Sequence, residues 1–356
     1  MENIILRPED YRPRPPAEEI IRRYGIGIVG CGSIARHAHL PAYRDFGYRV
    51  VGVCDINAES ARAAARDFNI PFWTTNLAAL LEHPEVAVID LAVPAAQRLP
   101  LVEMIAAAGK HILSQKPLAL TLAEAERIIA LCEAAGVTLM VNQQARWAPA
   151  HRALRVLLDQ GVLGHLYSVL HLHRSFQDQP GSWFVTLENF NIVDHGIHYI
   201  DLARYFTGQE PERVKATTVM VPGQVAVSPM IYTILCEYPP TAQVMTTLHF
   251  NNIVSPRAMH RYEWFLDGTR GSACASQTEL VVSLAAAPDQ RQTITLHGRW
   301  FPDAFGGSMG EMLSALAEGR EPATSGRDHL RTLRIAFAAV ESAKTGQAVA
   351  LTAPGG

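Results

Sequence analysis

The chain has 356 residues, more than the roughly 100–200 of a usual single domain, so we expect two domains. Hydrophobic residues make up 48% of the chain and charged residues 18%, which supports a large buried core and argues against a disordered or fibrous protein. The formal net charge of −3 gives no overall field that favours nucleic acid or an anionic membrane surface as a partner.

Targeting and redox signals indicate a cytoplasmic protein. The apolar stretches are far shorter than the roughly 18 residues of a membrane-spanning helix, and the charged N-terminus lacks the pattern of a signal peptide. The five cysteines form no C-x-x-C pair, which favours buried, reduced thiols. Residues 1–22 are rich in Pro and Arg and are expected to form either a loose tail or an arm on a neighbouring subunit.

From residue 24 short apolar runs alternate with helical patterns. Strands are expected at 24–30, 49–55, 86–94, 111–115 and 137–142. Helices are expected between them at 59–68, 77–82, 99–108 and 122–135. This alternation predicts a parallel sheet with helices on both faces, that is, a doubly wound Rossmann domain over residues 23–145.

After Pro149 the pattern changes. A helix at 151–160, a strand within 165–175 and a helix at 194–206 precede a series of strand-like runs. These runs lie at 213–221, 230–238, 243–250, 261–266, 279–284 and 293–297, and two helices at 308–318 and 327–344 end the chain. We therefore expect residues 146–350 to form an α+β domain with a large, mostly antiparallel open sheet. An open sheet with one uncovered face predicts a homodimer or homotetramer.

The first strand leads into a G-x-G-x-x-A loop. Gly30 permits a tight turn, Gly32 allows close approach of a pyrophosphate, and the small Ala35 lets helix and strand pack closely. Phosphates would lie at the helix N-terminus, against the backbone of the loop that includes Ser33 and Ile34. The loop predicts a dinucleotide site, and the alternative is a plain tight turn.

Asp55 ends the second expected strand, 20 residues after Ala35, where a carboxylate can bind both hydroxyls of a ribose. A carboxylate repels a 2′-phosphate, and the next residue, Ile56, offers no positive charge for one. NAD is therefore favoured over NADP. If the loop were only a turn, Asp55 would be a solvated surface residue.

Lys116 follows the fourth expected strand and precedes Pro117, at the carboxyl edge of the sheet. Ligands of such folds bind in the crevice at this edge, and a lysine there can polarise a substrate oxygen. From spacing alone, a solvated loop lysine is the favoured interpretation.

Asp194 and His198 are four residues apart and are expected to share one helix face. From spacing alone, Asp194 fits a helix N-cap and His198 fits a core histidine. Together with His195 and Asp201 they could pass for a metal site, yet no further cluster has ligand spacing, so no metal is predicted.

Four further residues are candidate substrate contacts. Arg146 and Trp147 follow the last Rossmann strand, and Trp183 and Asn191 precede the helix of Asp194. Aromatic rings beside amides suit a polyhydroxylated ring with one apolar face. For each of them core packing or a surface position is the alternative.

The sequence resembles the glucose-fructose oxidoreductase / inositol dehydrogenase / MocA family over residues 24–350. The resemblance rests on GIGIVGCGSIA, on AAAGKHILSQKPLAL, on NQQARWAPAHRALRVLLDQGVLG and on IVDHGIHYIDLARYFTG. It implies catalytic roles for Lys116, Asp194 and His198, with Lys116 also beside the cofactor. Where the family has glutamate before this lysine, the chain has Gln115, which can still bind a ribose hydroxyl; where the family often has histidine, it has Arg98.

The resemblance implies an NAD-dependent oxidoreductase that acts on a secondary hydroxyl of a sugar, cyclitol or sugar derivative. His198 is expected to be the general base, Lys116 to stabilise charge on the oxygen, and Asp194 to orient His198 or a neighbouring hydroxyl. Two alternatives are an NAD-recycling sugar hydrolase or lyase that oxidises its substrate transiently, and a non-catalytic dinucleotide-binding regulator.

Overall fold

The computed structural model describes residues 4–351, so residues 1–3 of the expected N-terminal arm lie outside the described range. The chain divides into two compact units. Pro13–Ala148 and Arg299–Arg331 form the first, which we call the parallel-sheet unit. The described parts of Met1–Arg12, Pro149–Gly298 and Thr332–Gly356 form the second, the mixed-sheet unit.

The parallel-sheet unit contains a sheet of six strands within the described range, in the order β3-β2-β1-β4-β5-β6. Every pairing in it is parallel. The strands are β1 (Gly25–Val29), β2 (Val50–Cys54), β3 (Phe72–Thr74), β4 (Val86–Leu91), β5 (His111–Ser114) and β6 (Leu139–Val141). This order is that of a doubly wound Rossmann domain and confirms the predicted fold class for this part of the chain.

Helices join and cover these strands. They are α2 (Glu18–Arg23), α3 (Leu40–Asp45), α4 (Ala58–Asp67), α5 (Leu77–Leu81), α6 (Arg98–Ala107), α7 (Leu122–Ala134) and α10 (Asp303–Glu318), with short 3₁₀ turns η2 (Ala95–Gln97) and η3 (Gln144–Trp147). Asn57, Asn76 and Thr121 cap α4, α5 and α7 by accepting a backbone N–H.

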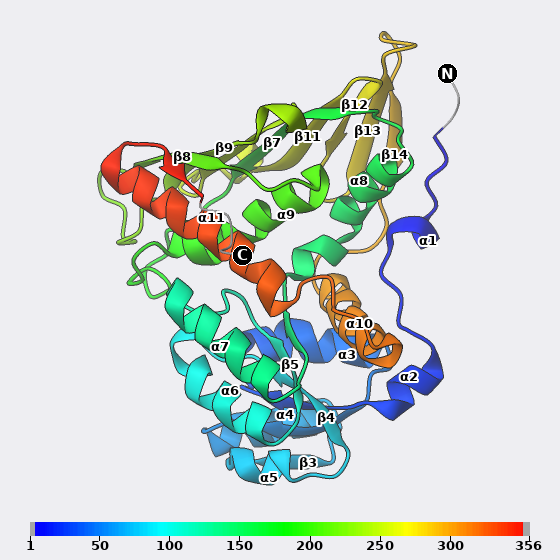
Figure 1. Ribbon diagram of the computed structural model, residues 1–356, viewed down its shortest axis with the longest axis vertical. Helices are drawn as coiled ribbons and strands as arrows, with labels where there is room; N and C mark the ends of the chain where they lie inside the picture. Colours follow the sequence, from blue (N-terminus) through cyan, green and yellow to red (C-terminus); the bar gives the residue numbers. More distant parts are fainter. Residues whose placement is uncertain (1–3, 352–356) are drawn as a thin grey trace. The chain divides into compact units, whose positions relative to one another are not determined.

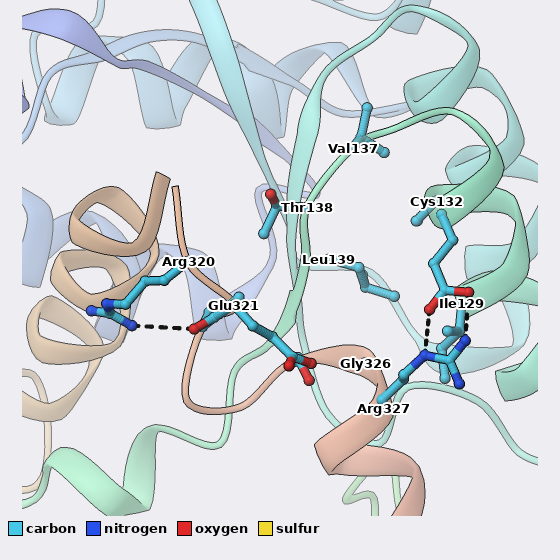
Figure 2. A pocket seen from close by; sticks show the side chains of 12 residues that line it. Ile129, Cys132, Val137, Thr138, Leu139, Arg320, Glu321, Gly326 and Arg327 are labelled. Atoms are coloured by element: carbon cyan, nitrogen blue, oxygen red, sulfur yellow. Dashed lines mark hydrogen bonds and ion pairs between the residues drawn. The ribbon is translucent and has the colours of Figure 1, made fainter. Parts of the chain in front are cut away.

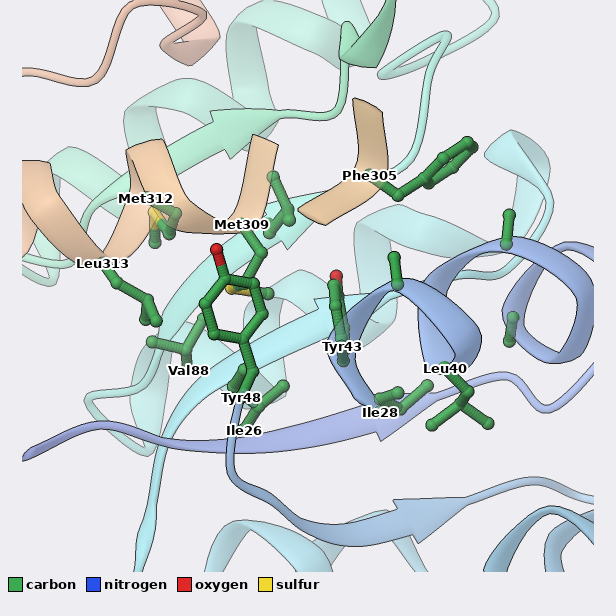
Figure 3. Close-up of a cluster of buried hydrophobic side chains, with 14 of the residues drawn as sticks. Ile26, Ile28, Leu40, Tyr43, Tyr48, Val88, Phe305, Met309, Met312 and Leu313 are labelled. Carbon is green, nitrogen blue, oxygen red and sulfur yellow. The ribbon is translucent and has the colours of Figure 1, made fainter. Parts of the chain in front are cut away.

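One face of this sheet packs against α3 and α10 (Figure 3). Ile26 and Ile28 of β1 are fully buried there, together with Tyr43 and with Met309 and Leu313 of α10. On the opposite face, a side chain at Gly27 would meet Leu80 of α5. The sheet is therefore buried on both faces, which explains the nearly continuous apolar runs of its strands.

Small residues let α10 approach its neighbours closely. A Cβ at Gly307 would lie 2.7 Å from the Cβ of Trp147, and one at Gly306 would lie 2.6 Å from the ring of Phe46. The Tyr48 hydroxyl donates a hydrogen bond of 2.8 Å to the Gly306 carbonyl. Because these contacts are so close, α10 forms part of the core of this unit although it follows the strands of the other unit in the chain.

The mixed-sheet unit contains a sheet of nine strands in its described part, in the order β14-β13-β12-β11-β7-β10-β9-β8-β15 (Figure 1). Its strands are β7 (Leu166–Arg174), β8 (Arg213–Val219), β9 (Ile231–Glu237), β10 (Met245–Asn251), β11 (Arg261–Gly268), β12 (Gly271–Ala275), β13 (Glu279–Leu284), β14 (Gln292–Thr295) and β15 (Val349–Ala350). The pairing of β7 with β10 is parallel and the other pairings are antiparallel. This mostly antiparallel sheet confirms the predicted α+β class.

Helices pack on one face of this sheet. They are α8 (Pro149–Asp159), α9 (Ile197–Thr207) and most of α11 (Gly326–Thr345), and α1 (Pro8–Tyr11) packs on α8. Two short 3₁₀ turns, η5 (Pro240–Ala242) and η6 (Arg257–Met259), lie in the loops before β10 and β11. Helix α9 contacts β7 and β10, and α8 contacts β12 and β13. The alternating burial along β9 and β10 follows from this one-sided cover.

The described part of the N-terminal segment contacts α8 and the residues after β14. Tyr11 is buried, and its hydroxyl accepts a hydrogen bond of 2.9 Å from the His297 backbone N–H. Arg152 of α8 donates to the Tyr11 carbonyl at 2.9 Å. Residues 4–12 are therefore packed on their own chain, because a large aromatic side chain and its polar partners hold them there.

Two helices contain a turn of π-helix that the sequence did not indicate. Segment η1 (Ala35–His39) precedes α3, and η4 (Asn191–His195) precedes α9. In each, a backbone N–H binds the carbonyl five residues earlier: Leu40 to Ala35, and Gly196 to Asn191 at 2.7 Å. Such turns re-aim the side chains around them and are frequent at functional sites.

Within the described residues, no helix is both long and apolar enough to cross a membrane. The five cysteines all lie in the described range as free thiols, and all except Cys274 are buried.

Candidate functional site

Three strand ends meet at one edge of the parallel sheet. The Ala92 N–H donates to the Val29 carbonyl at 2.8 Å, and the Gln115 N–H donates to the Leu91 carbonyl at 3.1 Å. The ladder thus continues one residue beyond β1, β4 and β5. It places the first residue after each strand side by side, at the carboxyl edge where ligands of doubly wound folds bind.

The two glycines of the loop have different structural roles. Gly30 has a φ of +95°, and a Cβ there would lie 2.7 Å from the Ala92 carbonyl oxygen. Gly32 is exposed, and no atom lies within 4 Å of where its Cβ would be. Gly30 is therefore required by the turn, whereas Gly32 leaves open space above the backbone for a ligand to approach.

The residues after Gly32 begin a helix. Ser33 is exposed, Ile34 is half-buried and Ala35 is fully buried. Residues 33–45 are helical without interruption, through η1 and α3. The N–H groups of the first turn and the helix dipole favour an anion at this place, so the loop fits a pyrophosphate.

The Asp55 carboxylate accepts a hydrogen bond from the backbone of the glycine loop. Its Oδ2 accepts the Cys31 backbone N–H at 2.7 Å, and its Oδ1 accepts the Asn57 N–H at 2.8 Å. The following residue, Ile56, is 93% exposed. Burial, and to a lesser extent the nearby Asp55 carboxylate, raise the pKa of the Cys31 thiol to about 12. This thiol therefore stays neutral beside the expected position of the phosphates.

Gln115 and Lys116 follow β5 at the same edge. Gln115 is buried, and its Oε1 accepts the Lys116 backbone N–H at 3.1 Å, while Lys116 is half-buried. The peptide bond between Lys116 and Pro117 is cis. These positions agree with the predicted placement of both residues at the carboxyl edge.

Arg98, the second departure from the family pattern, ties two loops of this edge together. Its Nε and one terminal nitrogen donate to the Val93 carbonyl at 3.0 and 2.8 Å. Its other terminal nitrogen donates to the Pro117 carbonyl. The buried guanidinium therefore connects the loop after β4 to the loop that carries Lys116.

Arg146 and Trp147 are placed differently from a simple crevice-facing pair. The Arg146 guanidinium donates to Asp328 at 2.7 Å and to the Ala323 carbonyl at 2.9 Å. Trp147 is buried in the core against Gly307 of α10. Both side chains thus have partners inside the parallel-sheet unit.

In the mixed-sheet unit, Asp194 lies within the π turn η4, whereas His198 lies in the first turn of α9. Asp194 is half-exposed and His198 is 8% exposed. The expected regular helix is interrupted between them, so Asp194 and His198 are not related by the i,i+4 geometry of an α-helix.

Asn191 fixes the start of this segment. Its side chain is fully buried, donates to the Pro229 carbonyl at 2.8 Å and accepts from Asn252 at 3.0 Å. Its backbone carbonyl accepts the Tyr232 hydroxyl at 2.8 Å and the Gly196 N–H at 2.7 Å. These contacts anchor the π turn from behind, and they use the polar atoms that a substrate contact would need.

The remaining residues of this segment have distinct surroundings. Trp183 is 67% exposed, with its ring edge-on to Phe190 at 5.4 Å between centroids. His195 lies against Gln177 at 3.2 Å and Tyr232 at 3.4 Å. Asp201 is fully buried and accepts the Thr332 hydroxyl at 3.1 Å, which is a structural contact.

The structure therefore brings together the loop residues Gly30 to Ala35, Asp55, Gln115 and Lys116 at one edge of one sheet. Among the described residues, no group of three or more His, Cys, Asp or Glu side chains is arranged to hold a metal ion.

A surface pocket of about 280 Å³ lies elsewhere in the parallel-sheet unit, between α7, β6 and residues 320–327 (Figure 2). Arg327 in its wall makes a two-point ion pair with Glu133, at 2.5 and 2.8 Å, and Arg320 pairs with Glu311 and Glu318. Because these charges already satisfy each other, the pocket is not assigned a ligand.

Two fully buried polar residues at this edge, His39 against Gln115 and Asp90 against His39, were not expected from the sequence. The available signal was Asp90 itself, an acid in the middle of an apolar strand. A buried carboxylate requires a hydrogen-bonding partner, but the pattern along one strand does not reveal which residue supplies it.

Comparison with known proteins agrees with this geometry. Residues 24–143 match the family model described as "Oxidoreductase family, NAD-binding Rossmann fold", and residues 151–274 match the GFO/IDH/MocA C-terminal domain. D-apiose dehydrogenase of Paraburkholderia graminis is 31% identical, over 93% of this chain and 90% of that protein. Inositol 2-dehydrogenase of Rhizobium meliloti is 26% identical, over 89% and 96% respectively.

Solved structures with the same fold include two that contain the dinucleotide. An oxidoreductase from Agrobacterium radiobacter in complex with NAD⁺, L-tartaric acid and magnesium has a TM-score of 0.81 and 24% identity, over 92% of this chain and 98% of that one. Levoglucosan dehydrogenase in complex with NADH and levoglucosan has a TM-score of 0.78 and 23% identity, over 92% and 99%.

Asp55→Ala should weaken NAD binding by about 1–3 kcal/mol, the scale of lost charge-assisted hydrogen bonds. The loss combines the missing ribose contact with release of the Cys31 N–H. Because the repulsion of a 2′-phosphate also disappears, the ratio of the NAD and NADP dissociation constants should move toward one. Calorimetric titration of both dinucleotides measures this.

The matched control is Glu59→Ala, which removes the same charge from the exposed first turn of α4 and should leave the ratio unchanged. Tighter binding of NADP than of NAD by the wild-type protein would contradict the role given to Asp55.

Proposed function

Because the chain belongs to the Gfo/Idh/MocA family of NAD-binding oxidoreductases, we propose that it oxidises a secondary hydroxyl of a sugar, cyclitol or sugar derivative, or reduces the matching ketone. The observation that carries the proposal is the common edge of the parallel sheet. There the glycine loop and Asp55 suit the pyrophosphate and ribose of NAD, and Lys116 follows β5, which is separated from β1 by β4 alone. We assign the cofactor to residues 23–145 and the substrate to residues 146–350.

The named relatives support the substrate class. They include dehydrogenases of D-apiose and inositol, and both are small polyhydroxylated molecules. A related fold has been solved with levoglucosan bound to its dehydrogenase. A secondary hydroxyl with neighbouring hydroxyls is therefore the reacting group that we propose.

Each catalytic residue has one task in this proposal. NAD, when bound, supplies the hydride acceptor. His198 removes the hydroxyl proton, because hydride loss from the carbon requires a forming carbonyl. Lys116 donates a hydrogen bond to the reacting oxygen and stabilises its charge. Asp194 orients His198 or a neighbouring hydroxyl.

The other predicted contacts divide into two groups. Trp183, exposed before η4, remains the aromatic surface proposed for a sugar ring. Arg146, Trp147 and Asn191 have partners within their own units, so we assign them the support of the segments around the site. The five free thiols fit the reducing cytoplasm, which we propose as the location.

The His198→Asn variant tests the proposed base. Asparagine keeps the polarity but cannot accept the proton, so kcat should fall by roughly 10²–10⁴-fold, with NAD affinity nearly unchanged. In the wild type the oxidation rate should rise with pH through one ionisation, because only the neutral imidazole accepts a proton, and histidine ordinarily titrates near pH 6.5. That ionisation should be absent in the variant. Steady-state rates between pH 5.5 and 9 measure both effects.

His195→Asn is the matched control, since it makes the same change within the π turn, where His195 contacts Gln177 and Tyr232. It should keep the pH dependence and most of the activity. An inactive His195 variant beside a nearly normal His198 variant would overturn the assignment.

We also propose a homodimer or homotetramer formed through the uncovered face of the mixed sheet. Leu170 of β7 pairs with Phe265 of β11, and Met245 of β10 pairs with Ser168, two residues before Leu170 on the same face. Leu170 and Met245 are exposed. The opposite face is covered by α8 and α9. This uncovered face carries both apolar and polar side chains, and the same face of a second copy is a partner with the same mixture.

Phe265→Glu should therefore lower the sedimentation mass of the protein toward that of one chain, because it introduces two charges into a symmetric interface. Sedimentation velocity at micromolar concentration measures this, with Met104→Glu on exposed α6 as the control. A wild-type protein that sediments as a monomer would exclude the proposed assembly.

A further inference from the structure

A line of buried polar groups runs behind the Lys116 loop. The His39 Nδ1 lies 2.6 Å from the Asp90 Oδ2, and both side chains are fully buried. The Tyr43 hydroxyl donates to the same oxygen at 2.8 Å. On the other side of the imidazole, His39 Nε2 lies 3.0 Å from Gln115 Nε2. One imidazole thus connects strand β4 with the residue that follows β5.

A backbone donor identifies which polar atom of the Gln115 side chain is the oxygen. The Lys116 N–H can only donate, and it lies 3.1 Å from one polar atom of the Gln115 side chain, which must therefore be the oxygen. The other polar atom is the NH₂ group, which faces His39. Interchange of the two amide atoms would place two donors against each other at Lys116.

The protonation of His39 follows from this orientation. Because the Gln115 NH₂ donates to Nε2, that nitrogen carries no hydrogen. The single imidazole proton is then on Nδ1, where it is donated to the Asp90 carboxylate. Each step has a donor facing an acceptor, from the Lys116 N–H to Gln115, from Gln115 to His39 and from His39 to Asp90.

The other neighbours of the ring leave this arrangement in place. The Phe305 ring of α10 lies 4.8 Å away between centroids and contributes no charge. The Tyr43 hydroxyl is 3.4 Å from Nδ1 and donates to Asp90. Burial and the Asp90 carboxylate raise the pKa of Tyr43 well above its ordinary value, so this group remains a neutral donor.

We propose that His39 is a positioning residue of this oxidoreductase, which Asp90 holds as the neutral Nδ1–H tautomer so that it sets the amide of Gln115 and, through it, the backbone at Lys116. The functional part of this inference rests on the role proposed for Lys116. The tautomer itself rests only on the geometry of the parallel-sheet unit. The π turn η1 contributes by carrying His39 in the helix that begins at the glycine loop.

A neutral His39 also requires the glutamine at position 115. A glutamate there offers only acceptors to His39, and Asp90 offers only acceptors on the opposite side. The imidazole would then have to donate from both nitrogens and carry a positive charge. Gln115 is therefore compatible with a neutral His39. The glutamine in place of the family's glutamate removes the need for a positive charge on this imidazole.

The first test is nitrogen NMR of the free protein labelled with ¹⁵N-histidine, with the His39 ring assigned from its backbone. His39 should show a protonated Nδ1 and an unprotonated Nε2 at neutral pH. In Gln115→Glu both nitrogens should be protonated. A wild-type ring that is protonated on Nε2, or on both nitrogens, would overturn the proposal whatever the activity.

The second test compares kinetics. Asp90→Asn should lower kcat about tenfold, the scale for partners that orient a functional side chain. The dissociation constant of NAD should change less than about threefold, because the phosphate loop and Asp55 are unaltered. Tyr43→Phe removes the other hydrogen bond to Asp90 and serves as the matched control, with the His39 tautomer and kcat both retained.

A double variant that reverses the order of donors and acceptors around His39 distinguishes a positioning role from general support of the fold. In Asp90→Asn combined with Gln115→Glu, residue 90 can donate to Nδ1 and residue 115 can accept from Nε2–H, so a neutral His39 is again satisfied. The double variant should regain most of the lost kcat, with the opposite tautomer in the spectrum. Additive losses in the double variant would contradict the proposal. Wild-type protein with the expected tautomer but no turnover of any polyol would contradict the proposed function instead.

Discussion

The parallel ladder across β1, β4 and β5 is the constraint on which the candidate site depends. Since neighbouring strands run in one direction and their pairing continues one residue beyond each strand, the residues that follow them must lie side by side. The glycine turn after β1, the loop after β4 and the Gln115–Lys116 pair after β5 therefore share one edge. The direction of the strands alone is sufficient to place them there. The finer placement is then made by buried polar groups, namely Asp55 on the loop backbone, Arg98 between two loops, and His39 against Gln115.

Much of the parallel-sheet unit could be predicted because its signals are local. The glycine loop, the acid at the end of β2 and the capped helices all follow from short-range patterns, and these elements were expected within a few residues of where they lie. The short strand β3 was not expected, since three half-exposed or exposed residues carry no clear apolar period. The position of α10 could not be predicted from the sequence either. Its glycines permit close contacts with residues more than a hundred positions away, such as Trp147, and no local pattern reveals these contacts.

The site residues show the same limit. The sequence indicates that Asn191 is an amide close to Asp194, but its burial and its bonds to Pro229 and Asn252 depend on strands far along the chain. The two π turns likewise leave no periodic signal, because the apolar spacing around them remains compatible with an ordinary helix. Patterns along the sequence thus locate chemical groups on elements, whereas the partners that orient those groups come from tertiary packing.

In the proposed function, the protein transfers hydride directly between a secondary carbon and NAD. The most direct measurement uses polyols and sugars that carry deuterium on the hydroxyl-bearing carbons, with mass spectrometry of both the nicotinamide and the sugar product. We expect one deuterium on the reduced nicotinamide for each ketone formed. Product that retains the deuterium, with no accumulation of reduced nicotinamide, would contradict net oxidation and show that the cofactor is regenerated within each turnover.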